Sequence, residues 1–226
     1  MFNINHFRIK EKNPKLSSQA LSDRISELRI VVQAIPPETL ASRTGSIFLS
    51  SRRGQEHFVF SLFKEEIQVK YPSIEMGNKS GDELPVFLQA LILYYFATST
   101  GAPLSGNWVS FADLPDGRMY AQAFQGYSGD QVVKWIGTDL GKFHASCKKA
   151  GGSPCALADA AYSFLGLPRM PLVLAYWLGE DEFPSTCKVL FDSTARNYLP
   201  IDACAIIGSQ LVKNVLRSTM DFAKGS

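Results

Sequence analysis

The most apolar part of the chain predicts the centre of a β-sheet. Residues 171–178 (PLVLAYWL) are apolar at consecutive positions, so both faces of a strand built from them must be buried. A polar turn follows at 179–184, and Cys187, Val189 and Phe191 then alternate with charged residues, which is typical of a strand with one buried face. The two segments therefore predict a hairpin whose first strand is central.

Polar residues after this hairpin predict a turn and then a long helix. Asp192 opens an Asp-Ser-Thr sequence, whose side chains bond their own downstream backbone in tight turns. Pro200 suits the first turn of a helix, and Asp202 favours the positive end of the helix dipole. From Ile201 onwards apolar residues recur at helical spacing and predict one stripe that packs on the sheet. These residues are Ala205, Gly208, Leu211, Val212, Val215 and Leu216.

The N-terminal half carries a second hairpin that is also followed by a helix. Residues 57–63 alternate between apolar and polar, and residues 67–71 repeat the alternation across a short turn at 64–66, which predicts an antiparallel pair. Residues 85–100 (PVFLQALILYYFATST) are apolar nearly all round, so they predict a buried helix. The order hairpin, loop, Leu-Pro step and helix thus occurs twice, and an internal duplication is one explanation.

Together these patterns predict an α+β fold. We expect one domain over residues 35–220, built from antiparallel β-hairpins covered by helices, after an N-terminal arm and helix over residues 1–34. Hydrophobic residues make up 46% of the 226 residues and charged residues 19%, which indicates a large core. Weaker patterns predict further elements: helices at 21–32, 132–136, 143–149 and 155–164, and strands at 46–50, 106–111 and 119–124.

Charge and hydropathy exclude two classes of partner. The formal net charge is only +2, and the lysines and arginines are scattered, so nucleic acid is not an expected partner. The longest apolar run, residues 85–97, is shorter than the ~20 residues that a membrane-spanning helix needs. The first residues lack the apolar segment of a signal peptide, and the expected compartment is therefore cytoplasmic.

Cysteine and histidine spacing gives no metal motif. No Cys-x-x-Cys pair is present, and His6 and His57 are far in sequence from His144. His144 and Cys147 share one face of a predicted helix, a spacing that suits a metal or an iron porphyrin but also an ordinary surface pair. We expect all four cysteines to be reduced and mostly buried: Cys147, Cys155, Cys187 and Cys204.

Aromatic and acidic residues around the second hairpin suggest a ligand site. We expect a flat or amphipathic small-molecule ligand in a cleft between the two hairpin–helix units. Its walls would be Trp108, Phe111 and Trp177, and its polar anchors Asp181, Glu182 or Asp192. Arg169 is close enough in the chain to take part. The candidate ligand-binding residues are Trp108, Ser110, Phe111, Trp177, Asp181, Glu182, Asp192 and Tyr198.

No sequence motif establishes a catalytic reaction. The chain has neither a Walker A motif nor a dinucleotide-binding glycine motif, and the glycine spacing at 126–130 is wrong for a nucleophile elbow. We therefore favour a non-catalytic ligand-binding or accessory role. Two alternatives remain open: an enzyme that uses Asp181, Glu182 and Asp192 as acid and base, and an adaptor that docks a metalloprotein partner.

Three segments resemble an uncharacterised bacterial and archaeal family, the domain of unknown function 3786. They are residues 91–103 (LILYYFATSTGAP), 103–117 (PLSGNWVSFADLPDG) and 167–200, and the resemblance covers roughly residues 35–217. The family pattern has Gly-Asp-Ala-Ala before the Leu-Pro block, whereas this chain has Ala-Asp-Ala-Ala at 158–161. None of these segments is a catalytic signature.

The resemblance implies a metabolic context. Family members are common in anaerobes, and some are fused to an iron–sulfur domain of the kind found in corrinoid proteins. This association implies a link to corrinoid, tetrapyrrole or one-carbon metabolism, with haem or a corrinoid as the candidate cofactor. The four cysteines of this chain do not form a cluster-binding set.

Overall fold

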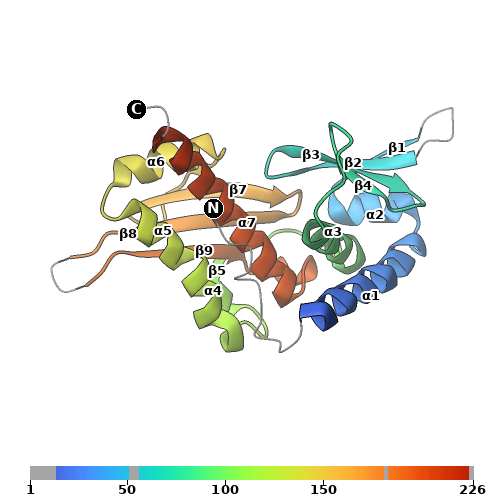
Figure 1. Ribbon diagram of the computed structural model, residues 1–226, viewed down its shortest axis with the longest axis horizontal. Helices are drawn as coiled ribbons and strands as arrows, with labels where there is room; N and C mark the ends of the chain where they lie inside the picture. The colour runs from blue at the N-terminus through green and yellow to red at the C-terminus, as the bar shows by residue number, and fades with distance from the viewer. Residues whose placement is uncertain (1–13, 51–55, 181–182, 224–226) are drawn as a thin grey trace.

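The computed structural model describes residues 14–50, 56–180 and 183–223 (Figure 1). Within these residues the strands form two antiparallel sheets, one with the order β1-β2-β3-β4 and one with the order β5-β9-β8-β7-β6. Helices pack on both sheets, so the fold is α+β, as the sequence predicts.

The four-stranded sheet comes from the N-terminal part of the chain. Its central hairpin, β2–β3, turns at Phe63 and Lys64, one residue earlier than expected, and both residues have positive φ angles of 49° and 73°. Paired positive φ angles suit a two-residue hairpin turn because they match the twist of the strands. The strands are β1 (Ile47–Ser50), β2 (Glu56–Leu62), β3 (Glu65–Tyr71) and β4 (Met76–Asn78).

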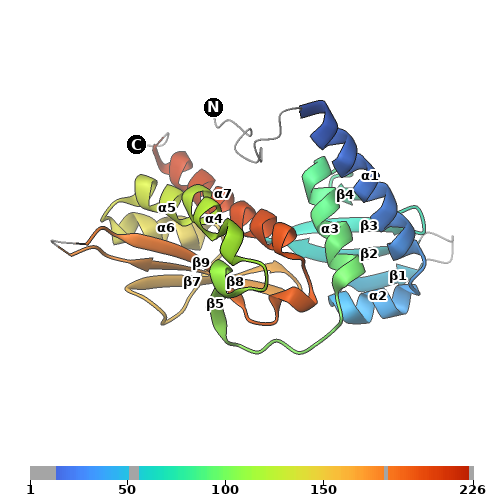
Figure 2. The same cartoon turned by 90° about the horizontal axis from the view of Figure 1, so that it is seen from below.

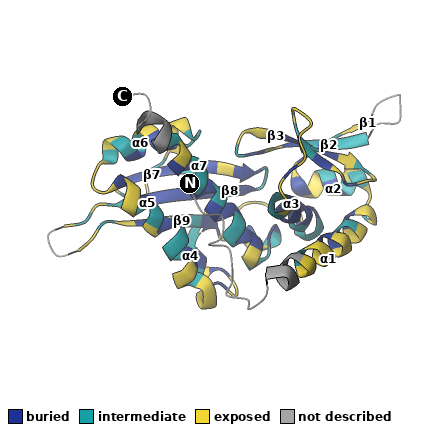
Figure 3. Cartoon of the chain, viewed as in Figure 1, coloured by how far each residue is buried: buried dark blue, intermediate teal, exposed yellow. Residues whose placement is uncertain are grey.

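Three helices accompany this sheet. Helix α3 (Val86–Thr98) is buried along most of its length, as its all-apolar sequence predicts. Phe96 of α3 packs edge-on against Phe58 of β2, with ring centroids 5.1 Å apart. Helix α1 (Pro14–Gln33) packs on α3, and its remaining surface is exposed (Figure 3). Between them α2 (Pro37–Thr44) ends at Gly45, which caps the helix with a φ of 71°.

The five-stranded sheet has β8 at its centre. Every residue of β8 from Leu172 to Tyr176 is buried, which confirms the prediction of a strand buried on both faces. The hairpin partner β9 buries Cys187, Val189 and Phe191 on one face, also as predicted. The strands are β5 (Trp108–Ser110), β6 (Ser153–Pro154), β7 (Ala160–Leu167), β8 (Met170–Trp177) and β9 (Thr186–Asp192).

The helices of the C-terminal part lie together on one face of this sheet, and the opposite face carries none of them (Figure 2). Helix α7 packs on α6, α5 and β7 with the apolar stripe that the sequence predicts. The helices are α4 (Ala121–Tyr127), α5 (Gly129–Ile136), α6 (Leu140–Lys149) and α7 (Ile201–Ala223), with single 3-10 turns η2 (Phe111–Asp113), η3 (Arg118–Tyr120) and η4 (Ala195–Asn197).

Two predictions of local structure are wrong. Residues 155–164 were expected to be helical, but they form a loop and the first half of β7. Residues 119–124 were expected to pair with β5, but they belong to η3 and α4, and β5 pairs with β9 instead. The residue before α5, Ser128, could have capped the helix, but its hydroxyl donates to the carbonyl of Phe124 instead.

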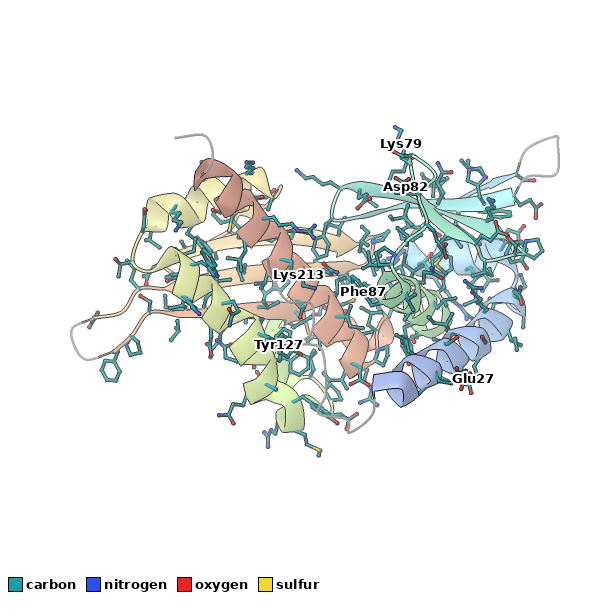
Figure 4. All side chains as sticks on the ribbon, viewed as in Figure 1. Glu27, Lys79, Asp82, Phe87, Tyr127 and Lys213 are labelled. Atoms are coloured by element: carbon teal, nitrogen blue, oxygen red, sulfur yellow. The ribbon has the colours of Figure 1, made fainter. Side chains whose placement is uncertain are left out.

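The two hairpin–helix units form one continuous hydrophobic core. The backbone N–H of Phe63, in the β2–β3 turn, donates a 3.0 Å hydrogen bond to the carbonyl of Gly166 in the β7 bulge. On the helical side, Lys213 of α7 lies over the ring of Phe87 of α3, at 5.5 Å from its centroid (Figure 4). Both units exist, but the structure does not show an internal duplication.

In the described ranges, no helix is long and apolar enough to cross a membrane.

Candidate functional site

A cavity lies where the two hairpin–helix units meet. Its volume is about 280 Å³, and its wall is formed by Thr98 at the end of α3, the turn at 114–116, Arg196 of η4 and the start of α7. Leu199 and Pro200, just before α7, and Ile201 and Cys204 in its first turn complete the wall. A site between the two units was expected from the sequence. However, none of the predicted ligand-binding residues that the structure describes lines this cavity.

The side chains that line this cavity are not strongly reactive. The Cys204 thiol is buried, burial raises its pKa to about 12, and it therefore carries its proton at neutral pH. At the rim, Arg196 and Asp116 form an ion pair of 3.7 Å in which both side chains are largely exposed. Leu114, Leu199 and the ring of Pro200 supply apolar surface. The lining can therefore hold a small molecule but offers no activated nucleophile.

Asp192 was predicted as a polar anchor for a ligand, but its carboxylate oxygens accept hydrogen bonds from the protein itself. It is 2% exposed, and its Oδ1 accepts hydrogen bonds from the backbone N–H and the hydroxyl of Ser105 at 3.2 and 2.9 Å. The backbone N–H and hydroxyl of Thr194 donate to the same oxygen at 2.9 and 2.5 Å, which confirms the predicted tight turn. The N–H of Gly106 donates to Oδ2 at 2.7 Å. Asp192 thus fixes the loop before β5 to the end of β9.

These hydrogen bonds control the ionisation of Asp192. Burial alone would raise its pKa, but the hydrogen bonds from Thr194, Ser105 and Gly106 outweigh burial and lower the pKa to about 2. A carboxyl group in this state is ionised at physiological pH and has no proton to give. Asp192 is therefore suited to a structural role and unsuited to acid–base chemistry.

Tyr198, another predicted site residue, lies in a buried polar network between the two units. Its hydroxyl donates to the carbonyl of Ala102, and its ring lies 6.3 Å from that of Tyr95 on α3. The Tyr95 hydroxyl donates to the carbonyl of Thr44 at 2.5 Å and accepts from the backbone N–H of Arg169 at 3.0 Å. Tyr95 and Tyr198 thus join α2, α3 and the β7–β8 turn to the end of the five-stranded sheet.

Trp108 and Trp177 lie on the helix-free face of the five-stranded sheet. They flank a floor of small buried side chains, Val173 and Ala175 of β8 and Ala161 of β7. Both tryptophans are partly buried, as are Cys155 and Leu190, which pack on the same floor. Two of the three predicted aromatic walls therefore share one face, and neither of them lines the cavity.

Phe111 and Ser110, also predicted to bind the ligand, do not join the tryptophans. Phe111 belongs to the core on the helical side, where its ring stacks on Phe124 with centroids 4.3 Å apart. The Ser110 hydroxyl donates to Asp113 Oδ2 at 2.6 Å, and Ser110 and Asp113 form the capping box of η2. Asp181 and Glu182 lie outside the described residues.

His144 and Cys147, the possible metal or porphyrin ligands, are also held by contacts within the protein. His144 Nδ1 lies 2.9 Å from the hydroxyl of Tyr162, and the two rings pack edge-on. Cys147 is fully buried, and burial raises the pKa of its thiol well above the ordinary value. No group of three or more His, Cys, Asp or Glu side chains suited to a metal ion occurs in the part of the chain that the structure describes.

Sequence reasoning missed the residues that form the cavity and its surroundings. Thr98, Arg196 and Cys204 come from three separate segments, and only the packing of α3 against α7 brings them together. Tyr95 lies within an apolar helix, so its sequence context suggested only core packing. One signal was present: a tyrosine in a fully buried helix needs a partner for its hydroxyl.

The fold and site define an α+β domain with a small cavity between two hairpin–helix units. The chain matches the model of the domain of unknown function DUF3786 over residues 36–214, and it belongs to that family. Searches of curated proteins and of solved structures gave no match.

Proposed function

We propose that this chain is a non-catalytic binding protein whose ligand is a small molecule held in the cavity between the two units. The observation that carries the proposal is the composition of this cavity, with apolar walls, a hydroxyl at Thr98 and a charged rim at Arg196 and Asp116. Such a lining of apolar surface with a few polar groups is typical of ligand sites. A neutral Cys204 thiol favours binding over catalysis.

The size of the cavity limits the ligand. A volume of about 280 Å³ lies just below the roughly 300–1,000 Å³ of pockets that enclose drug-sized ligands. A haem or corrinoid macrocycle is larger than the cavity can enclose. We therefore infer a compact ligand with an apolar body and one polar group, which can reach the Thr98 hydroxyl or the Arg196 guanidinium.

A cavity-filling variant tests this proposal. The protein is dialysed against a deproteinised extract of its native organism, and the small molecules that it retains are identified by mass spectrometry. Ile201 lines the cavity, and Ile201→Trp places an indole in that space. Ile206 is partly buried on the same helix but does not line the cavity, so Ile206→Trp is the matched control. A molecule retained by the wild type and by Ile206→Trp, but not by Ile201→Trp, supports the proposal; retention by no protein, or equally by all three, contradicts it.

A flat ligand on the helix-free sheet face is the second candidate. The observation that favours it is the pair Trp108 and Trp177 around a floor of small side chains, where an aromatic macrocycle could stack. Titration with haem and with cobalamin, followed by absorption and tryptophan fluorescence, tests this candidate. Saturable quenching that is lost in Trp108→Phe and Trp177→Phe supports stacking on this face. If both variants retain the quenching, or if the wild type shows no quenching, the ligand does not bind on this face.

A further inference from the structure

Two arginines lie around the C-terminal end of α2. A Cβ atom added at Gly45, the C-cap of α2, would lie 3.5 Å from both Cγ and Nε of Arg169, so the Arg169 side chain lies directly over this glycine. A Cβ atom added at Gly101 would lie 3.4 Å from Cα and 3.7 Å from Cγ of Arg43, so Arg43 lies over Gly101. Arg43 precedes Gly45 by two residues, which places the two arginines around one helix end.

Tyr198 connects the loop at Gly101 to Arg169. Its hydroxyl donates to the carbonyl of Ala102, the residue after Gly101, and the Arg169 guanidinium lies within its reach. Burial raises the pKa of Tyr198, and the charge and hydrogen bond of Arg169 act in the opposite direction. The contacts therefore run in a ring from Arg43 to Gly101, Tyr198, Arg169 and Gly45. We call these five residues the arginine ring.

The positive charge of the arginine ring is not neutralised by the protein. Across the described ranges, neither Arg43 nor Arg169 forms an ion pair with a carboxylate. The Nε atom of Arg169 is buried and has no hydrogen-bond partner. Asp192 is the carboxylate that acts on Tyr198, but its two oxygens are already held by Ser105, Gly106 and Thr194. A buried N–H of a guanidinium that lacks an acceptor is costly, so an external acceptor is expected.

We propose that the arginine ring is a binding site for an oxyanion, the phosphate or carboxylate group of a small molecule. The guanidinium of arginine presents N–H donors in a planar fork that matches two oxygens of such a group. Arg43 is exposed, which gives an anion access from solvent, whereas Arg169 is half-buried and holds its Nε donor in place. The glycines at 45 and 101 have positive φ angles of 71° and 79°, a backbone conformation that other residues rarely adopt, and each lies in van der Waals range of an arginine.

A purely structural role is the competing explanation. The C-terminal carbonyls of α2 carry partial negative charge, and arginines placed near them stabilise the helix end. Under that explanation Arg43 and Arg169 affect stability, but added anions have no specific effect. A measurement of anion binding therefore separates the two roles, whereas a measurement of stability alone does not.

The test is the thermal unfolding of the full chain with inorganic phosphate or succinate, each compared with chloride at equal ionic strength. We expect one or both probes to raise the midpoint of unfolding of the wild type in a saturable way, and the difference between the probes identifies the class of oxyanion. In Arg43→Gln and Arg169→Gln the dissociation constant is expected to rise by about tenfold or more, because each loses a charge-assisted hydrogen-bond donor. Arg24→Gln, an exposed arginine paired with Glu27 on α1, is the matched control and should respond like the wild type.

Two results would overturn the proposal. One is a wild type that responds to phosphate and succinate no more than to chloride. The other is an equal response of the wild type, Arg43→Gln and Arg24→Gln, which would locate the anion elsewhere. Arg43 is exposed and its replacement should leave the fold intact, so Arg43→Gln decides the matter even if Arg169→Gln does not fold. The cavity variant Ile201→Trp should retain the response, so this proposal and the proposed small-molecule cavity can fail separately.

Discussion

The backbone N–H of Gly106 and the carboxylate of Asp192 are 86 positions apart in the chain and form a hydrogen bond of 2.7 Å. This bond, with those from Ser105 and Thr194, fastens the loop before β5 to the end of β9. Because β5 has only three residues, its position depends on this anchor. Asp192 is therefore central to the stability of the five-stranded sheet.

Replacement of Asp192 tests this role. We expect Asp192→Asn to lower the free energy of unfolding by about 3 kcal/mol, because several donors lose a charged acceptor in a buried site. Asp116→Asn is the control, since Asp116 is largely exposed and its ion pair is long, and a change within about 0.5 kcal/mol is expected. Denaturant unfolding measures both values. Similar values for the two variants would show that the Asp192 hydrogen bonds contribute little.

The same residue predicts a pH dependence of stability. The folded-state pKa of Asp192 is about 2, below the ordinary value of 3.8, so the native state binds the proton less readily than the unfolded state. The resulting stabilisation, about 2 kcal/mol, is fully present above about pH 5 and is lost as the pH falls through about 2. We expect the difference in unfolding free energy between the wild type and Asp192→Asn to shrink between pH 5 and pH 2. A difference that is constant with pH would contradict the lowered pKa.

Tyr95 should contribute more to stability than its neighbour Tyr94. Tyr95→Phe leaves the carbonyl of Thr44 and the N–H of Arg169 without their partner in a buried site, which is expected to cost about 2 kcal/mol. Tyr94 is partly exposed and its hydroxyl accepts from Arg24 Nε at 3.2 Å, so Tyr94→Phe should cost less than about 0.5 kcal/mol. Chemical denaturation of both variants checks the contrast. Equal losses would mean that the buried network does not join the two units as described.

Two glycines in neighbouring helices give a test of packing. A Cβ atom at Gly129 would lie 1.9 Å from the carbonyl oxygen of Cys187, so Gly129→Ala must displace α5 from β9 and is expected to destabilise strongly. A Cβ atom at Gly126 of α4 meets no atom within 4 Å, so Gly126→Ala should be neutral or stabilise by up to about 1 kcal/mol. Thermal unfolding measures both effects. A well-tolerated Gly129→Ala would show that α5 does not approach the sheet so closely.

The cysteines should differ in reactivity. Cys147, Cys187 and Cys204 are buried, whereas Cys155 is partly exposed beside the helix-free sheet face. We expect a thiol reagent to label the native protein at Cys155 first, and Cys155→Ser to abolish this early labelling. Mass spectrometry of labelled peptides identifies the site. Rapid labelling of Cys204 would instead show that the cavity opens readily to solvent.

The sequence predicted the elements whose pattern depends on local burial. β8 was recognised because its residues are apolar on both faces, and α7 because its apolar residues recur at helical spacing. The strand β7 was mistaken for a helix because Ala158, Ala160 and Ala161 favour a helix. In the fold Ala161 is part of the floor of small side chains between the two tryptophans, and pairing of β7 with β8 outweighs local propensity.

The functional prediction was limited by contacts between distant segments. Nothing in the sequence showed that β5 would pair with β9, about eighty positions later. Nor did it show that the carboxylate of Asp192 would accept hydrogen bonds from the loop before β5. Trp108 and Trp177 were predicted as walls of a cleft between the two units; they share one sheet face, but neither lines the cavity, whose residues carry no chemical motif. Arg169 stood out only once the structure showed its Nε without a partner.

The most direct test of the proposed binding function is a crystal structure of the protein purified from its native organism. The account predicts electron density for a compact molecule in the space between Thr98, residues 114–116 and Cys204, with a polar atom within hydrogen-bond distance of Thr98 or Arg196. Ordered water alone in this cavity, together with a retained molecule bound at another place, would contradict it.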